Sequence, residues 1–459
     1  YNPIPLLAES HTVSDNGRTY TFKLRRGVKF HSGRDMNAED VAVSLKRWGK
    51  LATPGKAIFK NVEDVQAKDP QTVVMYLKEP SAVLLMALAR PNNGAFIYPK
   101  EVIDALQSVQ VTTSVGSRSG FQLAFSMGKN SNFEKVLIPA GFFDPMIRVI
   151  IIVTLNGTPN VIMDGVITRQ QVTASNEAGK STFTVTGEDV SAAMDLIDFS
   201  GIPYPAMPAE ARVALCIAKY AMFGIIPIVI PSILINVPIP VKEIPKHQGT
   251  DLAYINSLAN EVGYVFYVEP GPTPGMNFGY WGPEIKVGVP QRALTINMDG
   301  HTNTDALSFT YDGLAKTLYI LFIQELISKA PIPIPIPDIT PLNPPLGAKP
   351  PLPLHVKFIT NEPDQNGTAK YSPIQAALIG LAKASKGSDV ISGTGSLDVL
   401  RYGGVLQPRK LVGVRGAGIA YDGYYYVKSV THNIKHGEYK QSFALSRNAL
   451  VPSTGSVAV

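Results

Sequence analysis

Towards its end, the chain alternates apolar and polar positions with the period of two that is typical of a half-buried strand. The segment 424–434 is rich in aromatic and β-branched residues, and a His-Gly-Glu turn at 436–438 follows it. The pattern predicts a β-hairpin at the end of the chain. From residue 439, one face carries Tyr439, Gln441, Phe443 and Leu445, and the other carries Lys440, Ser442, Ala444 and Ser446.

A helical period appears near the start of the chain. The helix that it predicts has Asn37 as its N-cap, with Asp40 three residues further on, and places Val41, Leu45 and Trp48 along one face. The flanking elements that the sequence predicts are two strands, 19–30 and 71–80, and a short helix, 82–90. These elements together indicate a small α/β unit.

From about Leu106 the sequence becomes rich in β-forming residues separated by turn signals. An apolar strand ends at a hairpin turn, Asn156-Gly157, a second strand ends at Asp164-Gly165, and a third covers 181–189. Strands in this succession predict a meander suited to a small barrel.

Two helices are predicted next, in 207–224 and after residue 249. The second is capped by Thr250 or Asp251 and stops at Gly263, before another strand. Cys216, the only cysteine, lies on the apolar stripe of the first helix and is interpreted as a small core residue. We therefore expect neither an intramolecular disulfide nor a cysteine-based zinc cluster.

Two segments are unusually rich in proline. Residues 222–241 are uncharged and long enough for a membrane span, but four prolines interrupt any helix there. We interpret them as a connector or edge segment and expect no transmembrane segment. Residues 331–354 predict extended polyproline geometry in a stiff spacer or surface arm, which we favour over a ligand for a proline-reading domain. An amphipathic helix is expected at 371–389.

Length, composition and charge restrict the domain count and the possible partners. A chain of 459 residues with 45% hydrophobic content is folded and should divide into two to four domains. The net charge is +6, but only 17% of the residues are charged and the basic clusters are short. Because aromatic residues do not recur beside those clusters, we expect no nucleic-acid partner. The start, YNPIPLLAES, indicates a sequence that is processed or incomplete there.

The search for catalytic and metal-binding patterns nominates no residue. The chain has neither GxSxG nor a Walker sequence, and GVRGAG at 413–418 is interpreted as tight turns. His432 and His436 would lie roughly 13 Å apart along a strand, too far to share a metal, so we expect both to be solvated. We interpret the adjacent acids Glu188 and Asp189 as capping residues, because they precede a predicted helix whose dipole favours negative charge at its start. The prediction is therefore no enzyme, no cofactor, and no catalytic, cofactor-binding or metal residue.

The segment PLLAESHTVSDNGRTYTFKLRRGVKFHSGRDMNAEDVAVSLKRW resembles the peptide- and nickel-type (family 5) solute-binding proteins of bacterial ABC importers. Its strand, its GVKFHSG turn and its NAEDV helix start come in that family's order, although His11 stands where the family usually carries tryptophan. Members bind their ligand between two lobes, and residues 1–105 supply a piece of one lobe. The alternative function that this fragment implies is a periplasmic or lipid-anchored peptide-binding component of an importer.

The stretches GTDLAYINSLANEVGYVFYVEPG and YYVKSVTHNIKHGEYKQSFALSRNAL resemble the late control D family, the baseplate hub proteins of contractile phage tails and injection systems. The resemblance covers about 106–450. It implies a homotrimeric ring of paired β-barrels that joins an inner tube protein to a spike protein and contacts other baseplate subunits. It also implies assembly in the bacterial cytoplasm, followed by a place in a phage-tail-like particle, either inside the cell or released from it.

The expected fold class is mainly β with α/β insertions (α+β), with paired β-barrel hub domains and a small N-terminal α/β fragment. The domains that we predict are a solute-binding-protein-like fragment (1–105), a first hub barrel region (106–200), a helical and α/β hub region (201–330), a Pro-rich linker or arm (331–370) and a C-terminal hub barrel region (371–459). A cell-wall hydrolase fused to a hub is a rival that no visible motif supports.

The joining of an importer fragment to a hub has several explanations. A natural fusion, an error of gene prediction or assembly, and a deliberate fusion all leave the same sequence. Because one wall of its parent's core is missing, we expect the part before residue 106 to be less stably ordered than the rest. Hydrogen exchange that shows equal protection in both parts would overturn this expectation.

Overall fold

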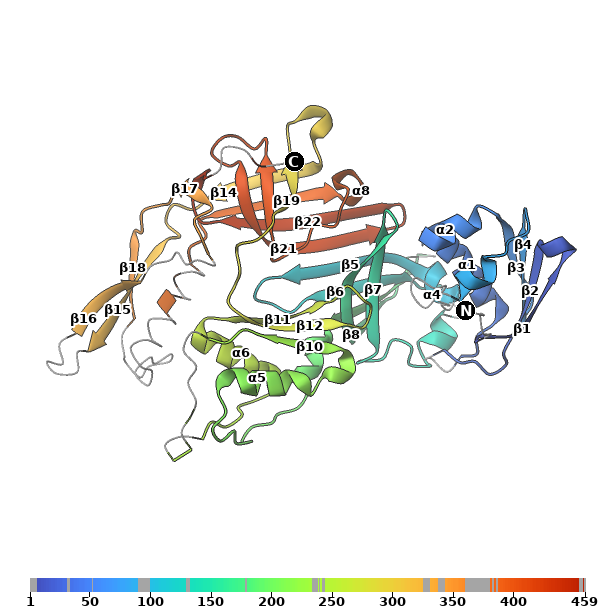
Figure 1. Ribbon diagram of the computed structural model, residues 1–459, viewed down its shortest axis with the longest axis horizontal. Coiled ribbons are helices and arrows are strands. Elements are labelled where there is room, and N and C mark those ends of the chain that lie inside the picture. The colour runs from blue at the N-terminus through green and yellow to red at the C-terminus, as the bar shows by residue number, and fades with distance from the viewer. Residues whose placement is uncertain are drawn as a thin grey trace.

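The computed structural model describes most of the chain (Figure 1). Figure 1 shows a small N-terminal unit at one end, a large sheet in the middle, a unit with helices α5 and α6 on one side of that sheet, and a small sheet at the other end. The described residues are 6–30, 34–51, 53–89, 100–128, 133–177, 180–232, 238, 240–241, 244–324, 331–336, 343–359, 380–381, 384, 387–453 and 457.

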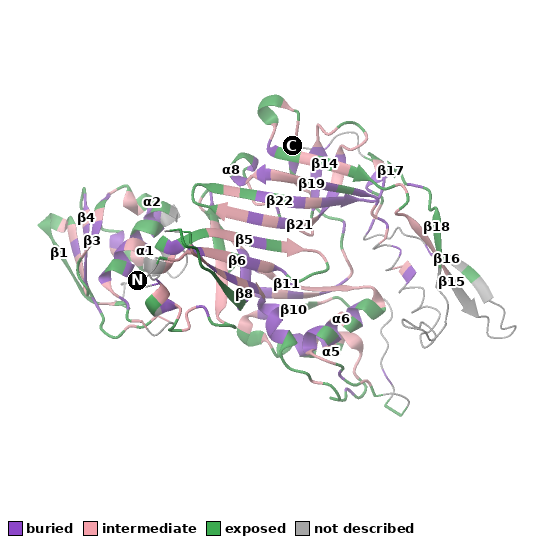
Figure 2. Ribbon diagram, turned by 180° about the vertical axis from the view of Figure 1, so that it is seen from behind, coloured by how far each residue is buried: buried purple, intermediate pink, exposed green. Residues whose placement is uncertain are grey.

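The N-terminal unit is a four-stranded antiparallel sheet covered by helices. Its strand order is β1-β2-β4-β3, so each strand pairs with one that lies close to it in sequence. Helix α1 packs on β3 and β4 around a core of its own, which Figure 2 shows as a separate group of buried residues. Its elements are β1 (Ala8–Ser14), η1 (Asp15–Gly17), β2 (Thr19–Leu24), α1 (Ala38–Leu51), α2 (Thr53–Phe59), β3 (Val62–Asp69), β4 (Thr72–Leu77), α3 (Leu84–Leu88) and α4 (Lys100–Ala105).

Helix α1 begins as the sequence predicts. The side chain of Asn37 accepts a hydrogen bond from the backbone N–H of Asp40 at 3.0 Å, and the Asp40 carboxylate accepts one from the backbone N–H of Asn37 at 3.0 Å. This reciprocal pair satisfies two donors at the start of the helix. Val41, Leu45 and Trp48 are buried, so the predicted apolar face is confirmed.

The β-rich remainder centres on one eleven-stranded sheet, which agrees with the expected mainly β fold class. Its main path is β14-β19-β22-β21-β5-β6-β9-β8-β7, and β13 and β20 join it through β21. Its strands are β5 (Leu106–Ser114), β6 (Gly120–Ser126), β7 (Arg148–Leu155), β8 (Thr158–Thr173), β9 (Thr182–Asp189), β13 (Gln291–Thr295), β14 (Thr304–Tyr311), β19 (Ile391–Asp398), β20 (Leu411–Arg415), β21 (Gly423–Lys435) and β22 (Glu438–Arg447). Short helical segments beside it are η2 (Phe133–Leu137), η3 (Val190–Asp195), η5 (Asp299–His301) and α8 (Val399–Tyr402).

This sheet joins the two predicted barrel regions, because β5 pairs antiparallel with β21. The ladder runs from Ser108 opposite Lys435 to Ser114 opposite Ser429. Across it, Gln110 donates a hydrogen bond to the side-chain oxygen of Asn433, 323 positions further along the chain, at 3.0 Å. The early and late β regions are therefore parts of one continuous sheet.

The closing hairpin is confirmed. β21 and β22 pair around Gly437, whose positive φ of 79° suits the tight turn between them. Gln441, Phe443 and Leu445 are buried while Lys440 is exposed, as the period-two pattern predicts. Gly416 and Gly418 lie in the turn between β20 and β21, as predicted, but the turn prediction is wrong for Gly413, which lies within β20 and leaves room for the Val457 side chain.

The meander contains one correct and one wrong turn prediction. Asn156 and Gly157 have φ values of 47° and 82° and connect β7 to β8, as predicted. At Asp164-Gly165, however, β8 continues without a turn to Thr173. A Cβ on Gly165 would lie 2.2 Å from the backbone oxygen of Glu188, so this glycine serves the close approach of β9.

A three-stranded sheet with order β10-β12-β11 carries helices α5 and α6 on one face (Figure 1). The Thr250 hydroxyl accepts a hydrogen bond from the backbone N–H of Ala253, and Gly263 ends α6 at φ 71°, so both predicted helix signals are confirmed. Trp281 is fully buried at the centre of the unit. Its elements are α5 (Ala209–Ala218), η4 (Ala221–Phe223), β10 (Ile225–Val229), α6 (Asp251–Val262), β11 (Val265–Pro270) and β12 (Asn277–Gly282).

The apolar segment 222–241 contributes β10, an edge strand of this sheet that contains Pro227. The interpretation as an edge segment is therefore confirmed for 225–229, whereas 233–237 and 239 lie outside the described residues. In the part of the chain that the structure describes, no helix has the length and apolarity of a membrane span.

The polyproline expectation is wrong for the start of the second Pro-rich segment. β16 (Pro331–Ile336) is a strand paired antiparallel with β15 (Thr317–Gln324), whose other neighbour is β18 (His355–Ile359). The strict Pro-Ile alternation explains this, because an edge strand needs N–H donors only at every second residue and the isoleucines retain them.

Two short strands and a predicted helix complete the description. β17 (Gly347–Lys349) pairs with β23 (Leu450–Pro452), which brings the segment before β18 against the chain's last strand. The helix predicted at 371–389 falls mostly outside the described residues.

Candidate functional site

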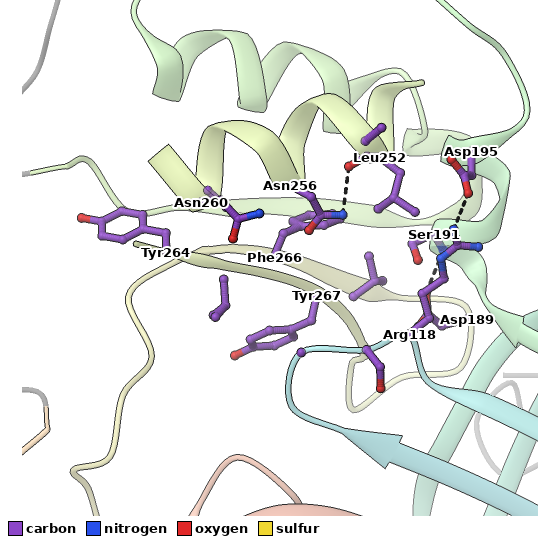
Figure 3. A pocket seen from close by; sticks show the side chains of 16 residues that line it. Arg118, Asp189, Ser191, Asp195, Leu252, Asn256, Asn260, Tyr264, Phe266 and Tyr267 are labelled. Carbon is purple, nitrogen blue, oxygen red and sulfur yellow. Dashed lines mark hydrogen bonds and ion pairs between the residues drawn. The ribbon is translucent and has the colours of Figure 1, made fainter. Parts of the chain in front are cut away.

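A pocket of about 580 Å³ lies between the large sheet and the α/β unit (Figure 3). Four segments form its walls: the β5–β6 turn, the residues around η3, helix α6 and strand β11. The pocket therefore lies where two parts of the fold meet, a common position for a binding site.

Ion pairs tie one corner of the pocket together. The Arg118 guanidinium lies 2.6 Å from a carboxylate oxygen of Glu188. It also pairs with Asp195 (Figure 3). Asp195 accepts a hydrogen bond from the Thr250 hydroxyl at 2.6 Å. The bond from Thr250, together with Arg118, lowers the pKa of Asp195. This corner links the β5–β6 turn to the start of α6.

Asp189 forms the buried part of the same wall. Its carboxylate accepts hydrogen bonds from the backbone N–H groups of Ser119 at 2.7 Å and Ser191 at 3.0 Å. The second bond caps η3, as the sequence predicts for this acid, whereas Glu188 pairs with Arg118 instead. Burial raises the pKa of Asp189.

The opposite wall is aromatic and is formed by Tyr264, Phe266 and Tyr267 (Figure 3). The Tyr267 ring packs at 5.0 Å from the ring of Tyr280, and the Arg409 guanidinium lies 3.9 Å from the Tyr267 centroid. Burial raises the pKa of the Tyr267 hydroxyl. This wall offers a rigid surface with both apolar and hydrogen-bonding character.

Within the described residues, strand β11 is an edge strand, and β12 is its only partner strand. Gly271 donates its N–H to Met276 across the β11–β12 pair at 2.8 Å. Because hydrogen-bonded pairs alternate in an antiparallel ladder, Phe266 and Val268 direct their backbone groups away from β12. The pocket thus combines an ion-paired corner, an aromatic wall and a strand edge, which is chemistry for binding an extended polypeptide.

A second feature is a buried cluster between α5 and α6. Cys216, His247 and Asp251 are each at most 1% exposed, and their ligand-type atoms all lie within 4.8 Å of one another. The cysteine is a core residue, as predicted, and burial raises the pKa of its thiol to about 12. Sequence spacing could have linked only His247 and Asp251, four residues apart, since helix packing alone brings Cys216 to them.

The structure corrects the prediction for His432. We expected a solvated side chain, but His432 is buried in the closing hairpin, where its Nδ1 is 2.8 Å from the Tyr439 hydroxyl. Burial lowers the pKa of His432 to about 4. The alternation of the strand places His432 on the same face as Val430, and this signal for burial was overlooked. His436 is exposed, as predicted.

Comparison with known proteins separates the two ends of the chain. Residues 2–117 match the family model for bacterial extracellular solute-binding proteins, family 5 Middle. The probable peptide ABC transporter periplasmic-binding protein y4tO of Sinorhizobium fredii is 35% identical over 115 residues, which are 25% of this chain and 21% of that protein. The glutathione-binding protein GsiB of Escherichia coli K12 is 46% identical over 91 residues, or 19% and 18% of the two chains. The chain thus spans about a fifth of the length of these relatives, and the N-terminal resemblance is confirmed.

The rest of the chain is similar to phage tail proteins in structure. The 43 kDa tail protein of prophage MuSo2 from Shewanella oneidensis aligns with a TM-score of 0.50 at 13% identity, over 78% of this chain and 97% of that one. A tail protein of Neisseria meningitidis MC58 aligns with a TM-score of 0.49 at 12% identity, over 75% and 93%. The first alignment shows a shared fold, so the resemblance to tail proteins is confirmed at the level of fold.

Proposed function

We propose that this protein is a structural hub of a phage-like contractile tail or injection system, in which three copies form a ring between the inner tube and the spike. The observation that carries the proposal is the continuous sheet through β5 and β21, in a chain with the fold of a prophage tail protein over 78% of its length. The ring contacts other baseplate subunits, is assembled in the bacterial cytoplasm and then belongs to a tail-like particle.

The two ends of the main path of the eleven-stranded sheet support the ring. Within the described residues, β7 pairs only with β8, and β14 pairs only with β19. A sheet that ends in two different free edges can join its neighbours head to tail, and such heterologous contacts close into a ring when the rotation allows it. β7 (RVIIIVTL) is strongly apolar, and Ile152 in it is 39% exposed, which suits an edge that a second copy covers.

Light scattering tests the ring. Three chains of 49.5 kDa give about 150 kDa, and a chain that starts at Leu106 should also form a trimer if the N-terminal unit takes no part. Ile152→Lys on β7 should dissociate the trimer, because a charge on an edge strand opposes pairing. The matched control is Gln122→Lys on β6, which is exposed but is paired on both sides, with Gln110 of β5 and Thr186 of β9. A monomer at concentrations well above micromolar would remove the ring from the proposal.

A second candidate function rests on the family match of residues 2–117, namely peptide binding as part of an ABC importer. The N-terminal unit supplies one four-stranded sheet with its helices, while a ligand cleft needs a second wall. A thermal shift assay with short peptides tests this function. A peptide that binds the native state must raise the melting temperature, by an amount that grows with the logarithm of its concentration relative to its Kd.

A further inference from the structure

We propose that Cys216, His247 and Asp251 form a binding site for a zinc-type divalent cation that links α5 to the start of α6. The site goes beyond the proposed hub function and does not depend on it. Its three potential ligand atoms, a thiol sulfur, an imidazole nitrogen and a carboxylate oxygen, lie within 4.8 Å of one another, and all three side chains are buried.

His247 is the strongest indication of a ligand. Its Nδ1 lies 3.0 Å from the Tyr204 hydroxyl, while its Nε2 is buried and makes no hydrogen bond of normal geometry within the described residues. Nε2 faces Asp251 at 3.7 Å from Oδ1. A metal-binding histidine characteristically hydrogen-bonds through one ring nitrogen, which leaves the lone pair of the other nitrogen for the cation. The ring is fixed in place, because it packs 4.3 Å from the ring of Tyr254.

The donor set selects the class of metal. Thiolate and imidazole favour zinc and similar borderline-soft cations, whereas magnesium and calcium prefer sites built from oxygen ligands. Ligand atoms around a tetrahedral zinc lie about 3.3–3.8 Å apart, so the His247–Asp251 separation of 3.7 Å already fits and the thiol needs to move inward by no more than about 1 Å. Three protein ligands leave a fourth position for water.

Lys219 is the competing cation. Its ammonium lies 2.9 Å from Oδ1 and 3.2 Å from Oδ2 of Asp251, and the Tyr220 hydroxyl donates to Oδ2 at 2.9 Å. The Lys219 side chain is 33% exposed, so it can retreat towards solvent when a divalent cation takes its place. The thiol proton is released as the metal–sulfur bond forms. Removal of the lysine charge should therefore strengthen metal binding.

Metal titration of the full chain tests the site. The purified protein is stripped with a chelator and titrated with Zn²⁺, with Co²⁺ as a spectroscopic substitute and with Mg²⁺ as a negative control. We expect one Zn²⁺ per chain and, for Co²⁺, the near-ultraviolet charge-transfer absorption of a thiolate ligand. Cys216→Ser and His247→Gln should each weaken Zn²⁺ binding at least tenfold and abolish that absorption or shift it. Lys219→Met should tighten Zn²⁺ binding.

His432→Gln is the matched control. His432 is also a buried histidine whose Nδ1 meets a tyrosine hydroxyl, at 2.8 Å, but it belongs to the closing hairpin and not to the α5–α6 cluster. Its replacement should leave Zn²⁺ affinity unchanged. Binding of Zn²⁺ that survives in Cys216→Ser and His247→Gln would mean adventitious surface binding and would overturn the proposal. The absence of stoichiometric binding in both the native chain and Lys219→Met would overturn it as well, even if the ligand variants fail to fold.

Discussion

The N-terminal unit and the eleven-stranded sheet are built in opposite ways. In the N-terminal unit every strand pairs with one within the first eighty residues, around a core of its own. In the large sheet, β5 pairs with β21, which lies near the other end of the chain. A unit whose strands pair locally keeps its contacts when the rest of the chain changes. A sheet that pairs strands from early and late in the chain depends on both of those segments. We therefore expect perturbations to stay within the region in which they are made.

The largest expected effect comes from core truncation. Phe125 is 1% exposed, and its ring centroid lies 5.3 Å from that of Phe133 and 5.2 Å from that of Phe143. Phe125→Ala should lower the free energy of unfolding of the large sheet by about 3–5 kcal/mol, because it leaves a cavity in this aromatic cluster. Hydrogen exchange of the β6 and β9 amides measures the loss.

The matched variant lies in the other region. Met75 on β4 is fully buried, and Met75→Ala should cost about 2–5 kcal/mol in the N-terminal unit. Each variant should speed exchange in its own region and leave the other unchanged. Equal loss of protection in both regions would show that the two unfold together, and the contrast between them would then be wrong.

The next effect is a dependence of stability on pH that comes from a buried histidine of the large sheet. Burial lowers the pKa of His432 to about 4, whereas the unfolded chain holds histidine near 6.5. The unfolded state therefore binds the proton first, and stability is lost as pH falls from about 6.5 towards 4. The loss amounts to about 3 kcal/mol. Urea unfolding at pH 7.5 and pH 4.5, followed at β21, measures this slope.

Two variants isolate this titration. His432→Gln cannot take up the proton, so its stability should vary less between pH 6.5 and 4 than that of the native chain. His436→Gln changes an exposed histidine at the tip of the same hairpin and should keep the native slope. If all three chains show one slope, His432 is not the group responsible.

The same contrast explains what could be predicted from the sequence. Signals that act over a few residues were correct: the Asn37–Asp40 caps, Gly263 at the end of α6 and the Asn156-Gly157 turn, because neighbouring backbone atoms decide them. Alternation in the closing hairpin was also correct, since it is a local period.

Features decided by remote contacts were not predictable. The meeting of Cys216 with His247 depends on how separate elements pack, and no sequence spacing encodes that packing. The burial of His432, in contrast, follows the period-two face that it shares with Val430, so there a local signal was overlooked. The prediction of a turn at Gly165 was wrong because this glycine instead allows the close approach of strand β9, more than twenty residues away in sequence. The candidate pocket was missed for the same reason: its walls come from four segments between residues 116 and 268.

A smaller effect should stay within the N-terminal unit. Asn37→Ala removes the side-chain oxygen that accepts the Asp40 N–H, and should lower the stability of this unit by about 1 kcal/mol. Asn37→Ser keeps a capping oxygen and should restore most of the loss. Exchange of the α1 amides measures both. Slower exchange in the alanine variant than in the serine variant would contradict the role of the cap.

The smallest expected effect lies at the pocket corner, where the large sheet meets the α/β unit. Arg118 pairs with Glu188 and Asp195, but its side chain is 36% exposed, so solvent screens both pairs. Arg118→Gln should therefore cost less than about 1 kcal/mol, and the difference from the native chain should vanish in 1 M salt. Chemical denaturation with urea at low and high salt measures it. A loss of several kcal/mol that salt does not reduce would mean that Arg118 holds the large sheet and the α/β unit together. A change at this one residue would then affect both parts, contrary to the expectation that perturbations stay within one region.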